Sequence, residues 1–155
     1  MRKILVSECL YGGRPVRYDG AEIQCMDPLF LKWKAEGRFV PVCPEILGGL
    51  GVPRVEAQRV GGSVMAKDGS DVTMAFARGA ELALSIADEH DVAFAIFKDG
   101  SPSCGARLIH DGTFSGAKVP GMGIAAETLA AAGFKVFAEY ETGLAAELLE
   151  ILGFD

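Results

Sequence analysis

The chain has 155 residues, of which 50% are hydrophobic and 23% charged, a composition typical of one compact globular domain and not of a disordered segment. It carries 15 basic and 21 acidic residues, and the net charge of -6 argues against a surface built to neutralise the phosphates of long nucleic acids. We therefore expect a single domain over residues 1–155.

The N-terminal segment favours a cytoplasmic protein. Met1, Arg2 and Lys3 are followed by only a short apolar-leaning run before Glu8, too short for a signal-peptide core. No apolar run approaches the ~20 residues that span a bilayer, so we expect no membrane partner. In a reducing compartment, four cysteines indicate metal binding or catalysis in preference to disulfide bonds.

Strand-like and helix-like segments alternate along the first half of the chain. Residues 3–7 and 39–42 are short and apolar, which predicts two strands. Between them, Asp27 and Pro28 provide the N-cap and first turn of a helix that runs to about Glu36. Residues 46–62 are rich in glycine and lack a steady period, which predicts an irregular excursion over the mouth of a site. Residues 64–67 predict a short strand or hairpin arm.

The second half continues the alternation. The predicted elements are a helix over 71–90, a strand over 92–97, a glycine-rich loop over 112–123, a helix over 124–132, a strand over 134–138 and a C-terminal helix. Asp71 or Thr73 is a suitable cap for the first of these helices. An apolar stripe that includes Leu144 and Leu148 predicts that the last helix packs against the domain.

This order of elements predicts an α/β fold with an open, mainly parallel sheet and helices on both faces, in a Rossmann-like three-layer arrangement. Ligands of such sheets bind beyond the carboxyl ends of the strands. Cys9, Cys43 and Cys104 each follow a predicted strand by a few residues, so we expect their thiols to converge at one edge. Cys25 precedes a helix instead, and we leave it out of the site.

Three converging thiolates suit a metal. No Cys-x-x-Cys pair is present, which disfavours a zinc ribbon or a thioredoxin-like motif. A 4Fe-4S cluster with three cysteine ligands would leave one iron open as a Lewis acid. From spacing alone, ordinary buried cysteines are an equal alternative.

Several blocks of sequence occur in an order that resembles a known family. They are Ser7-Glu8-Cys9-Leu10, Val16-Arg17-Tyr18-Asp19-Gly20, Val42-Cys43-Pro44-Glu45-Ile46-Leu47-Gly48-Gly49, Ser101-Pro102-Ser103-Cys104-Gly105 and Asp111-Gly112-Thr113-Phe114-Ser115-Gly116. Together they resemble the thiouracil desulfurase family, from residue 3 to about 137.

The resemblance implies a 4Fe-4S cluster held by Cys9, Cys43 and Cys104, with one open iron that takes the sulfur of a thiolated pyrimidine. It also implies conversion of 2-thiouracil to uracil without net redox change. The alternative is a non-catalytic module in which the same cysteines hold zinc or a cluster for structure or sensing. The substrate could be a free base, a nucleoside or tRNA, and the acidic charge favours a small molecule over tRNA. The oligomeric state is open.

Four neighbouring residues are candidates for the chemistry. Glu45 is the predicted base that activates water, and a helix-start or surface carboxylate is the alternative role. Ser101 and Ser103 could orient the substrate or tune the cluster; turn capping is the alternative, less favoured for Ser101 than for Ser103. Asp19 could be a second acid or base, or the first residue of an Asx turn.

Four further residues are weaker candidates. Phe114 and Ser115 could stack on and hydrogen-bond a pyrimidine, or simply pack their own loop. His90 is placed to interact with the carboxyl end of a helix, and His110 stands near a turn. Neither histidine completes a recognisable catalytic set.

Overall fold

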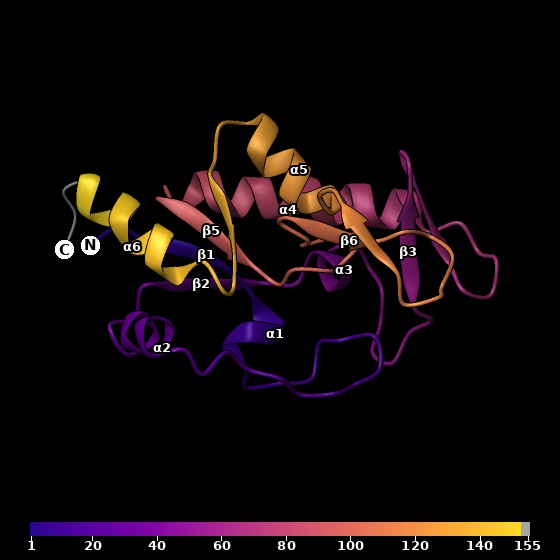
Figure 1. Ribbon diagram of the computed structural model, residues 1–155, viewed down its shortest axis with the longest axis horizontal. Helices are drawn as coiled ribbons and strands as arrows, with labels where there is room; N and C mark the ends of the chain where they lie inside the picture. The colour runs from indigo at the N-terminus through magenta and orange to yellow at the C-terminus, as the bar shows by residue number, and fades with distance from the viewer. Residues whose placement is uncertain (153–155) are drawn as a thin grey trace.

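Four parallel strands form the central sheet, in the spatial order β2-β1-β5-β8 (Figure 1). The computed structural model describes residues 1–152. The strands are β1 (Ile4–Ser7), β2 (Phe39–Val42), β5 (Phe94–Phe97) and β8 (Val136–Ala138). β1 is buried along its whole length, as expected of a central strand that is covered on both faces. The predicted parallel α/β architecture is confirmed.

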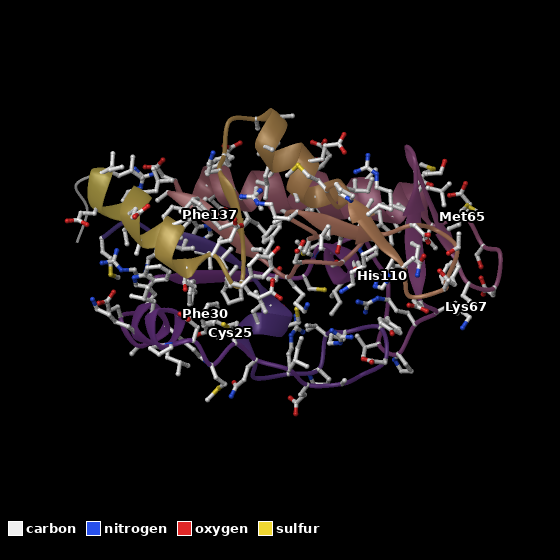
Figure 2. The ribbon with its side chains drawn as sticks, in the orientation of Figure 1. Cys25, Phe30, Met65, Lys67, His110 and Phe137 are labelled. Atoms are coloured by element: carbon white, nitrogen blue, oxygen red, sulfur yellow. The ribbon has the colours of Figure 1, made fainter. Side chains whose placement is uncertain are left out.

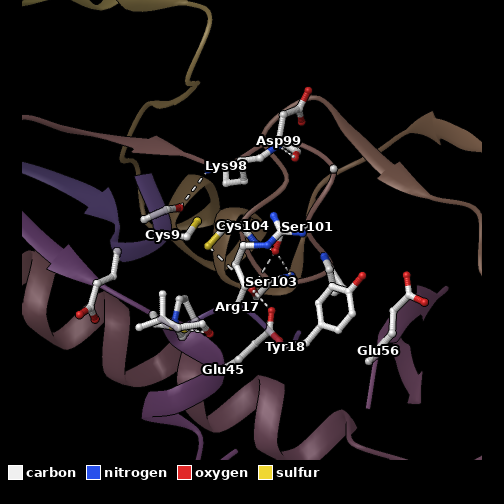
Figure 3. Close-up of a pocket in the computed structure, with 18 of the residues that line it drawn as sticks. Cys9, Arg17, Tyr18, Glu45, Glu56, Lys98, Asp99, Ser101, Ser103 and Cys104 are labelled. Atoms are coloured by element: carbon white, nitrogen blue, oxygen red, sulfur yellow. Dashed lines mark hydrogen bonds between the residues drawn. The ribbon is translucent and has the colours of Figure 1, made fainter. Parts of the chain in front are cut away.

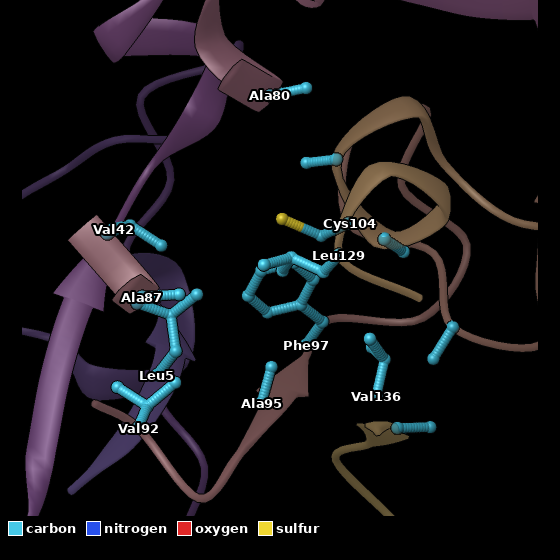
Figure 4. Packing of buried hydrophobic residues seen from close by; sticks show 14 residues of the cluster. Leu5, Val42, Ala80, Ala87, Val92, Ala95, Phe97, Cys104, Leu129 and Val136 are labelled. Atoms are coloured by element: carbon cyan, nitrogen blue, oxygen red, sulfur yellow. The ribbon is translucent and has the colours of Figure 1, made fainter. Parts of the chain in front are cut away.

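Each central strand sends alternate side chains to opposite faces, and a separate apolar cluster fills each side. Ile4 and Val6 of β1 join one cluster, which also holds Phe30 and Phe137 (Figure 2). Leu5 joins the other cluster with Cys104 (Figure 4). The first face is covered by α2 (Pro28–Ala35) and α6 (Thr142–Ile151), and the second by α4 (Thr73–Glu89) and α5 (Ile124–Ala131).

The strand order creates a topological switch point between β1 and β5. From β1 the chain moves to β2 on one side, and from β2 it crosses to β5 on the other side of β1. In open α/β sheets the crevice above such a point is the usual ligand site, because the loops that leave the two strands diverge there. Cys9 follows β1 and Cys104 follows β5, so both lie at this point.

Two short helices lie at the same edge of the sheet. α1 (Glu8–Tyr11) continues directly from β1, and α3 (Pro44–Leu47) follows β2 after Cys43. α3 rests on α4 through a contact between two glycines: a Cβ on Gly48 would lie 2.0 Å from the Ala75 carbonyl oxygen, and one on Gly79 would lie 1.8 Å from that of Pro44. Only glycines allow the two backbones to approach this closely.

Two hairpins extend the domain beyond the central sheet, and each corrects a prediction. β3 (Ala57–Val60) pairs with β4 (Ser63–Ala66), so the expected irregular excursion over 46–62 is wrong at its end. β6 (Leu108–His110) pairs with β7 (Lys118–Pro120), so the expected loop over 112–123 contains a strand. β7 is exposed throughout and therefore lacks the apolar alternation that marks a strand in a sequence.

The predicted N-cap is confirmed for α2 and is wrong for α4. Asp27 caps α2 as predicted, since its carboxylate accepts hydrogen bonds from two backbone N–H groups of the first turn. α4 has no side-chain cap and begins after Val72. Asp71 instead closes a turn with the Thr73 N–H, and the Thr73 hydroxyl bonds the Val64 backbone of β4. The Thr73 hydroxyl therefore bonds to β4 and does not cap α4.

No helix within residues 1–152 is long and apolar enough to cross a membrane.

The glycine contact predicts a position-specific effect on stability. Gly79→Ala should lower the free energy of unfolding by about 1–3 kcal/mol, because the added methyl would force α3 away from α4. Gly143→Ala in α6 is the matched control, since nothing lies within 4 Å of its added Cβ. It should leave stability unchanged or raise it by up to about 1 kcal/mol. Urea unfolding measures both, and equal effects of the two substitutions would contradict the packing argument.

Candidate active site

Three cysteines from three strand ends line one cavity of about 240 Å³. Cys9 lies in α1 after β1, Cys43 is the N-cap of α3 after β2, and Cys104 follows the turn after β5. Figure 3 shows the thiols of Cys9 and Cys104 pointing toward one another at one end of the cavity. All three are free thiols. The expected convergence is therefore observed.

Burial dominates the electrostatics of these thiols. It raises the pKa of Cys9 to about 12, with the neighbouring Cys43 as the next cause. Burial likewise raises the pKa of Cys43, and it raises that of Cys104 well above the usual value, again with the other two cysteines contributing. Thiolates in this cavity therefore need a strong positive charge beside them, which a bound metal centre supplies.

The three thiols line one cavity and lie close enough that Cys9 and Cys43 both raise the pKa of Cys104. Within residues 1–152, no three Cys, His, Asp or Glu side chains are arranged to hold one metal ion. A cluster whose irons occupy separate corners spaces its thiolate ligands apart, and these residues fit such a group.

Glu45 lies in the wall of the same cavity and is hydrogen-bonded through both carboxylate oxygens. Its Oε2 accepts from the Ser103 hydroxyl at 2.7 Å, and its Oε1 accepts from Arg54 Nε at 3.0 Å. Its side chain is 14% exposed. A carboxylate with two fixed donors keeps lone pairs free for a third partner, such as a water molecule in the cavity.

The two serines make different contacts, and the Ser103 hydroxyl also lies 3.8 Å from the Cys104 sulfur. The Ser101 oxygen accepts from the backbone N–H groups of Ser103 and Cys104, at 3.2 and 3.0 Å, and so caps the turn. Ser103 is the residue that contacts Glu45, and its hydroxyl also lies 3.0 Å from that of Ser101. Because Ser103 has one hydroxyl hydrogen, the hydroxyls form a chain in which Ser101 donates to Ser103 and Ser103 to Glu45. Turn capping, the alternative role, is thus observed for Ser101, where it was the less favoured one.

The sequence and the structure of this chain are similar to those of known proteins. Residues 4–141 match the 2-thiouracil desulfurase family. The chain belongs to this family. An uncharacterised protein, YbbK, of Bacillus subtilis (strain 168) is 38% identical, over 89% of this chain and 96% of its own length. A solved structure of a [4Fe-4S]-dependent thiouracil desulfidase, TudS, is 42% identical and superposes with a TM-score of 0.94, over 97% of this chain and 99% of its own.

Three other candidates lie outside the cavity wall of this desulfurase-family chain. Asp19 accepts from the Ala21 N–H and lies 3.5 Å from Arg17 Nε, which matches its alternative role in an Asx turn. Ser115 hydrogen-bonds within its own loop, and the Phe114 N–H donates to Gln58. None of the three is among the residues that line the cavity.

Cys25 also lies apart from the other cysteines. It packs against the apolar cluster beneath α2, near Phe30 (Figure 2), and does not line the cavity. Its side chain is half-buried, and burial raises the pKa of its thiol. This placement agrees with its exclusion from the predicted ligand set.

Sequence reasoning missed several residues of the cavity wall. Arg17, Tyr18, Arg54, Lys98 and His110 all line it. Arg17 and Tyr18 belong to a motif block, which is the only sequence signal that could have found them. His110 is the last residue of β6, next to the turn of the hairpin, as expected. His90 bonds the Ile86 carbonyl oxygen at the end of α4, as predicted.

Arg54 is the residue that holds Glu45 in place. Its side chain is 9% exposed and makes three directed bonds: Nε to Glu45, Nη1 to the Gly51 carbonyl at 2.9 Å and Nη2 to the Val16 carbonyl at 2.8 Å. One guanidinium thus joins the carboxylate to two separate loops. Lysine would not reproduce this fork of donors.

Loss of the Arg54 side chain should destabilise the fold. Arg54→Met leaves the Glu45 carboxylate nearly buried without its ion-pair partner and should lower the free energy of unfolding by about 3 kcal/mol. Arg59→Met is the matched control, since Arg59 is 14% exposed but its partner Glu127 is 57% exposed, so the carboxylate that remains is solvated and the loss should cost less than that of Arg54. Denaturant unfolding of anaerobically purified proteins compares them. A similar loss in both variants would show that the Arg54 bonds carry no special weight.

Proposed function

We propose that this protein is a desulfurase that removes sulfur from thiolated pyrimidines, converting 2-thiouracil to uracil and releasing sulfide without net redox change. The observation that carries the proposal is the cavity itself, where three free cysteines from three strand ends face a hydrogen-bonded glutamate. Membership of the 2-thiouracil desulfurase family and the likeness to a thiouracil desulfidase support it.

Cys9, Cys43 and Cys104 are the proposed ligands of a 4Fe-4S cluster. With three protein ligands, such a group would supply one open iron, a Lewis acid able to polarise a thiocarbonyl and to bind its sulfur. The chain contributes three thiols and the cavity that they line. Burial of the thiols favours this arrangement, because an unliganded thiolate there is costly while a metal-bound one is neutralised.

Glu45 is the proposed general base. Water must replace the sulfur at the thiocarbonyl carbon, and it loses a proton as its oxygen bonds to that carbon. The Glu45 carboxylate accepts this proton while the departing sulfur leaves with the electron pair of its bond to carbon. Arg54 and Ser103 orient the carboxylate, and Ser101 orients Ser103. The two serines therefore act through hydrogen bonds, and no role in the chemistry is assigned to Asp19.

The proposed substrate is a small molecule and not tRNA. The cavity of about 240 Å³ lies near the lower limit of the ~300–1,000 Å³ typical of small-molecule sites. The net charge of -6 disfavours a long polyanion. We further propose that residues 1–155 act as one domain in the cytoplasm.

The ligand assignment predicts a sharp difference among the four cysteines. Cys9→Ser, Cys43→Ser and Cys104→Ser should each lose most of the iron and the brown colour of the anaerobically purified protein. Cys25→Ser is the control and should keep both, because Cys25 lies outside the cavity. Iron and acid-labile sulfide analysis measures the content. If Cys25→Ser lost iron as completely as Cys104→Ser, the three-ligand assignment would be wrong.

The assignment of Glu45 as the base predicts that its loss lowers turnover without lowering iron content. Glu45→Gln keeps the shape of the side chain but removes its basic oxygen, so iron content should stay near wild type while sulfide release from 2-thiouracil falls about 10²–10⁴-fold. Asp19→Asn is the control, since asparagine preserves the Asx turn and should leave turnover within about twofold. A fully loaded Glu45→Gln protein with normal turnover would exclude Glu45 as the base.

A further inference from the structure

The sulfur that leaves a thiolated pyrimidine carries negative charge. Figure 3 shows Cys9 and Cys104 at one end of the cavity and Tyr18 at the other. In the reaction proposed above, the sulfur departs toward the cysteine end with the electron pair of its bond to carbon. A positively charged donor that is already in place at that end would lower the barrier to this step.

Two cations act on the cysteine end. The positive charges of Arg17 and Lys98 both oppose the rise in the pKa of Cys9, and both side chains line the cavity. The Lys98 ammonium is already engaged, since its Nζ lies 3.1 Å from a Glu139 carboxylate oxygen and 3.0 Å from the Asp99 carbonyl oxygen. Of these two cations, Arg17 is therefore the one to consider for a ligand.

The terminal nitrogens of Arg17 are open to the cavity. Its Nε lies 3.5 Å from Asp19 Oδ1, at the outer limit of a hydrogen bond. Its Nη1 and Nη2 atoms make no hydrogen bond to any of residues 1–152, and neither is enclosed by protein. The side chain is 29% exposed. A molecule in the cavity can therefore reach both nitrogens and the N–H groups that they carry.

Hydrogen bonds on both sides of Arg17 fix its backbone. Arg54 donates from Nη2 to the Val16 carbonyl oxygen and from its backbone N–H to that of Tyr18, each at 2.8 Å. The Cys43 sulfur lies 3.9 Å from the same Val16 oxygen, so Arg17 starts next to a proposed cluster ligand. Its guanidinium carbon is 5.8 Å from the centroid of the Tyr18 ring. The guanidinium is thus positioned before a ligand binds.

We propose that Arg17 is a catalytic residue whose Nη–H groups bind the sulfur as it leaves the substrate and hold the hydrosulfide ion that results. The inference rests on the proposed function. In that reaction the oxygen of water bonds to the thiocarbonyl carbon, the bond from this carbon to sulfur breaks, and the sulfur keeps the electron pair. One proton of the water passes to Glu45 and the other to the sulfur, which gives uracil and hydrosulfide.

The proposed contact strengthens as the reaction proceeds. A guanidinium binds an anionic acceptor more tightly than a neutral one, and the thiocarbonyl sulfur of the substrate is neutral. An interaction that is stronger in the transition state than with the bound substrate raises kcat and changes KM little. Arg17 should therefore affect kcat more than KM.

Hydrosulfide binding tests the contact without turnover. Cluster-loaded proteins are titrated anaerobically with sodium hydrosulfide, and the change in visible absorption gives Kd. Arg17→Met should raise this Kd about tenfold, and Arg17→Lys, which keeps the charge, should recover part of the loss. Arg14→Met is the control and should match wild type, because Arg14 is 60% exposed and does not line the cavity. Iron content should be the same in all four proteins.

Two substrates test the catalytic role. Hydroselenide is a weaker base than hydrosulfide, so selenium leaves 2-selenouracil with less assistance than sulfur needs to leave 2-thiouracil. Arg17→Met should lower kcat for 2-thiouracil about 10²-fold and leave KM within about threefold. The loss of kcat for 2-selenouracil should be smaller, about tenfold. A merely structural role of Arg17 would lower both rates by the same factor.

The outcomes separate the inference from the proposed function. An unchanged Kd for hydrosulfide, equal losses of kcat with the two substrates, or loss of iron from Arg17→Met would overturn the role of Arg17 and leave the desulfurase proposal intact. A loaded wild-type protein that releases no sulfide from 2-thiouracil would instead overturn the proposed function, and the inference with it.

Discussion

The whole site depends on the parallel register of β2, β1 and β5. Neighbouring strands lie about 4.8 Å apart, and in a parallel sheet their carboxyl ends emerge at the same edge. Residues that follow these strands therefore meet although they are distant in sequence. Because β1 lies between the other two and is buried throughout, the three cysteines attach to neighbouring strands at this edge. The cavity is a consequence of this register.

A charge without a partner in this cavity would destabilise the fold, because the ionisable groups there are buried. Burial raises the pKa of all three thiols of the cavity, and Glu45 is nearly buried beside them. Unpaired charges at such places destabilise a fold by several kcal/mol, at the order-of-magnitude level. The two apolar clusters on either face of the sheet and the Arg54 ion pair provide compensation.

The segment between α3 and β3 is irregular, but hydrogen bonds of Arg54 hold it against the site. It has no helix or strand of its own over residues 48–56, yet Arg54 bonds two loops and Glu45 through its side chain. The Arg54 N–H also donates to the Tyr18 carbonyl oxygen at 2.8 Å. The segment therefore positions the predicted base as well as covering the cavity.

The sequence by itself determined the fold class and the gathering of three cysteines, because apolar periodicity and the strand-end rule are local signals that survive without coordinates. The motif blocks determined the family. Only the tertiary structure decided which serine contacts Glu45, since both lie in one turn and the choice depends on how that turn meets α3. Likewise, β7 and the placement of His110 arise from pairing between distant segments, and an exposed strand leaves no apolar pattern in the chain.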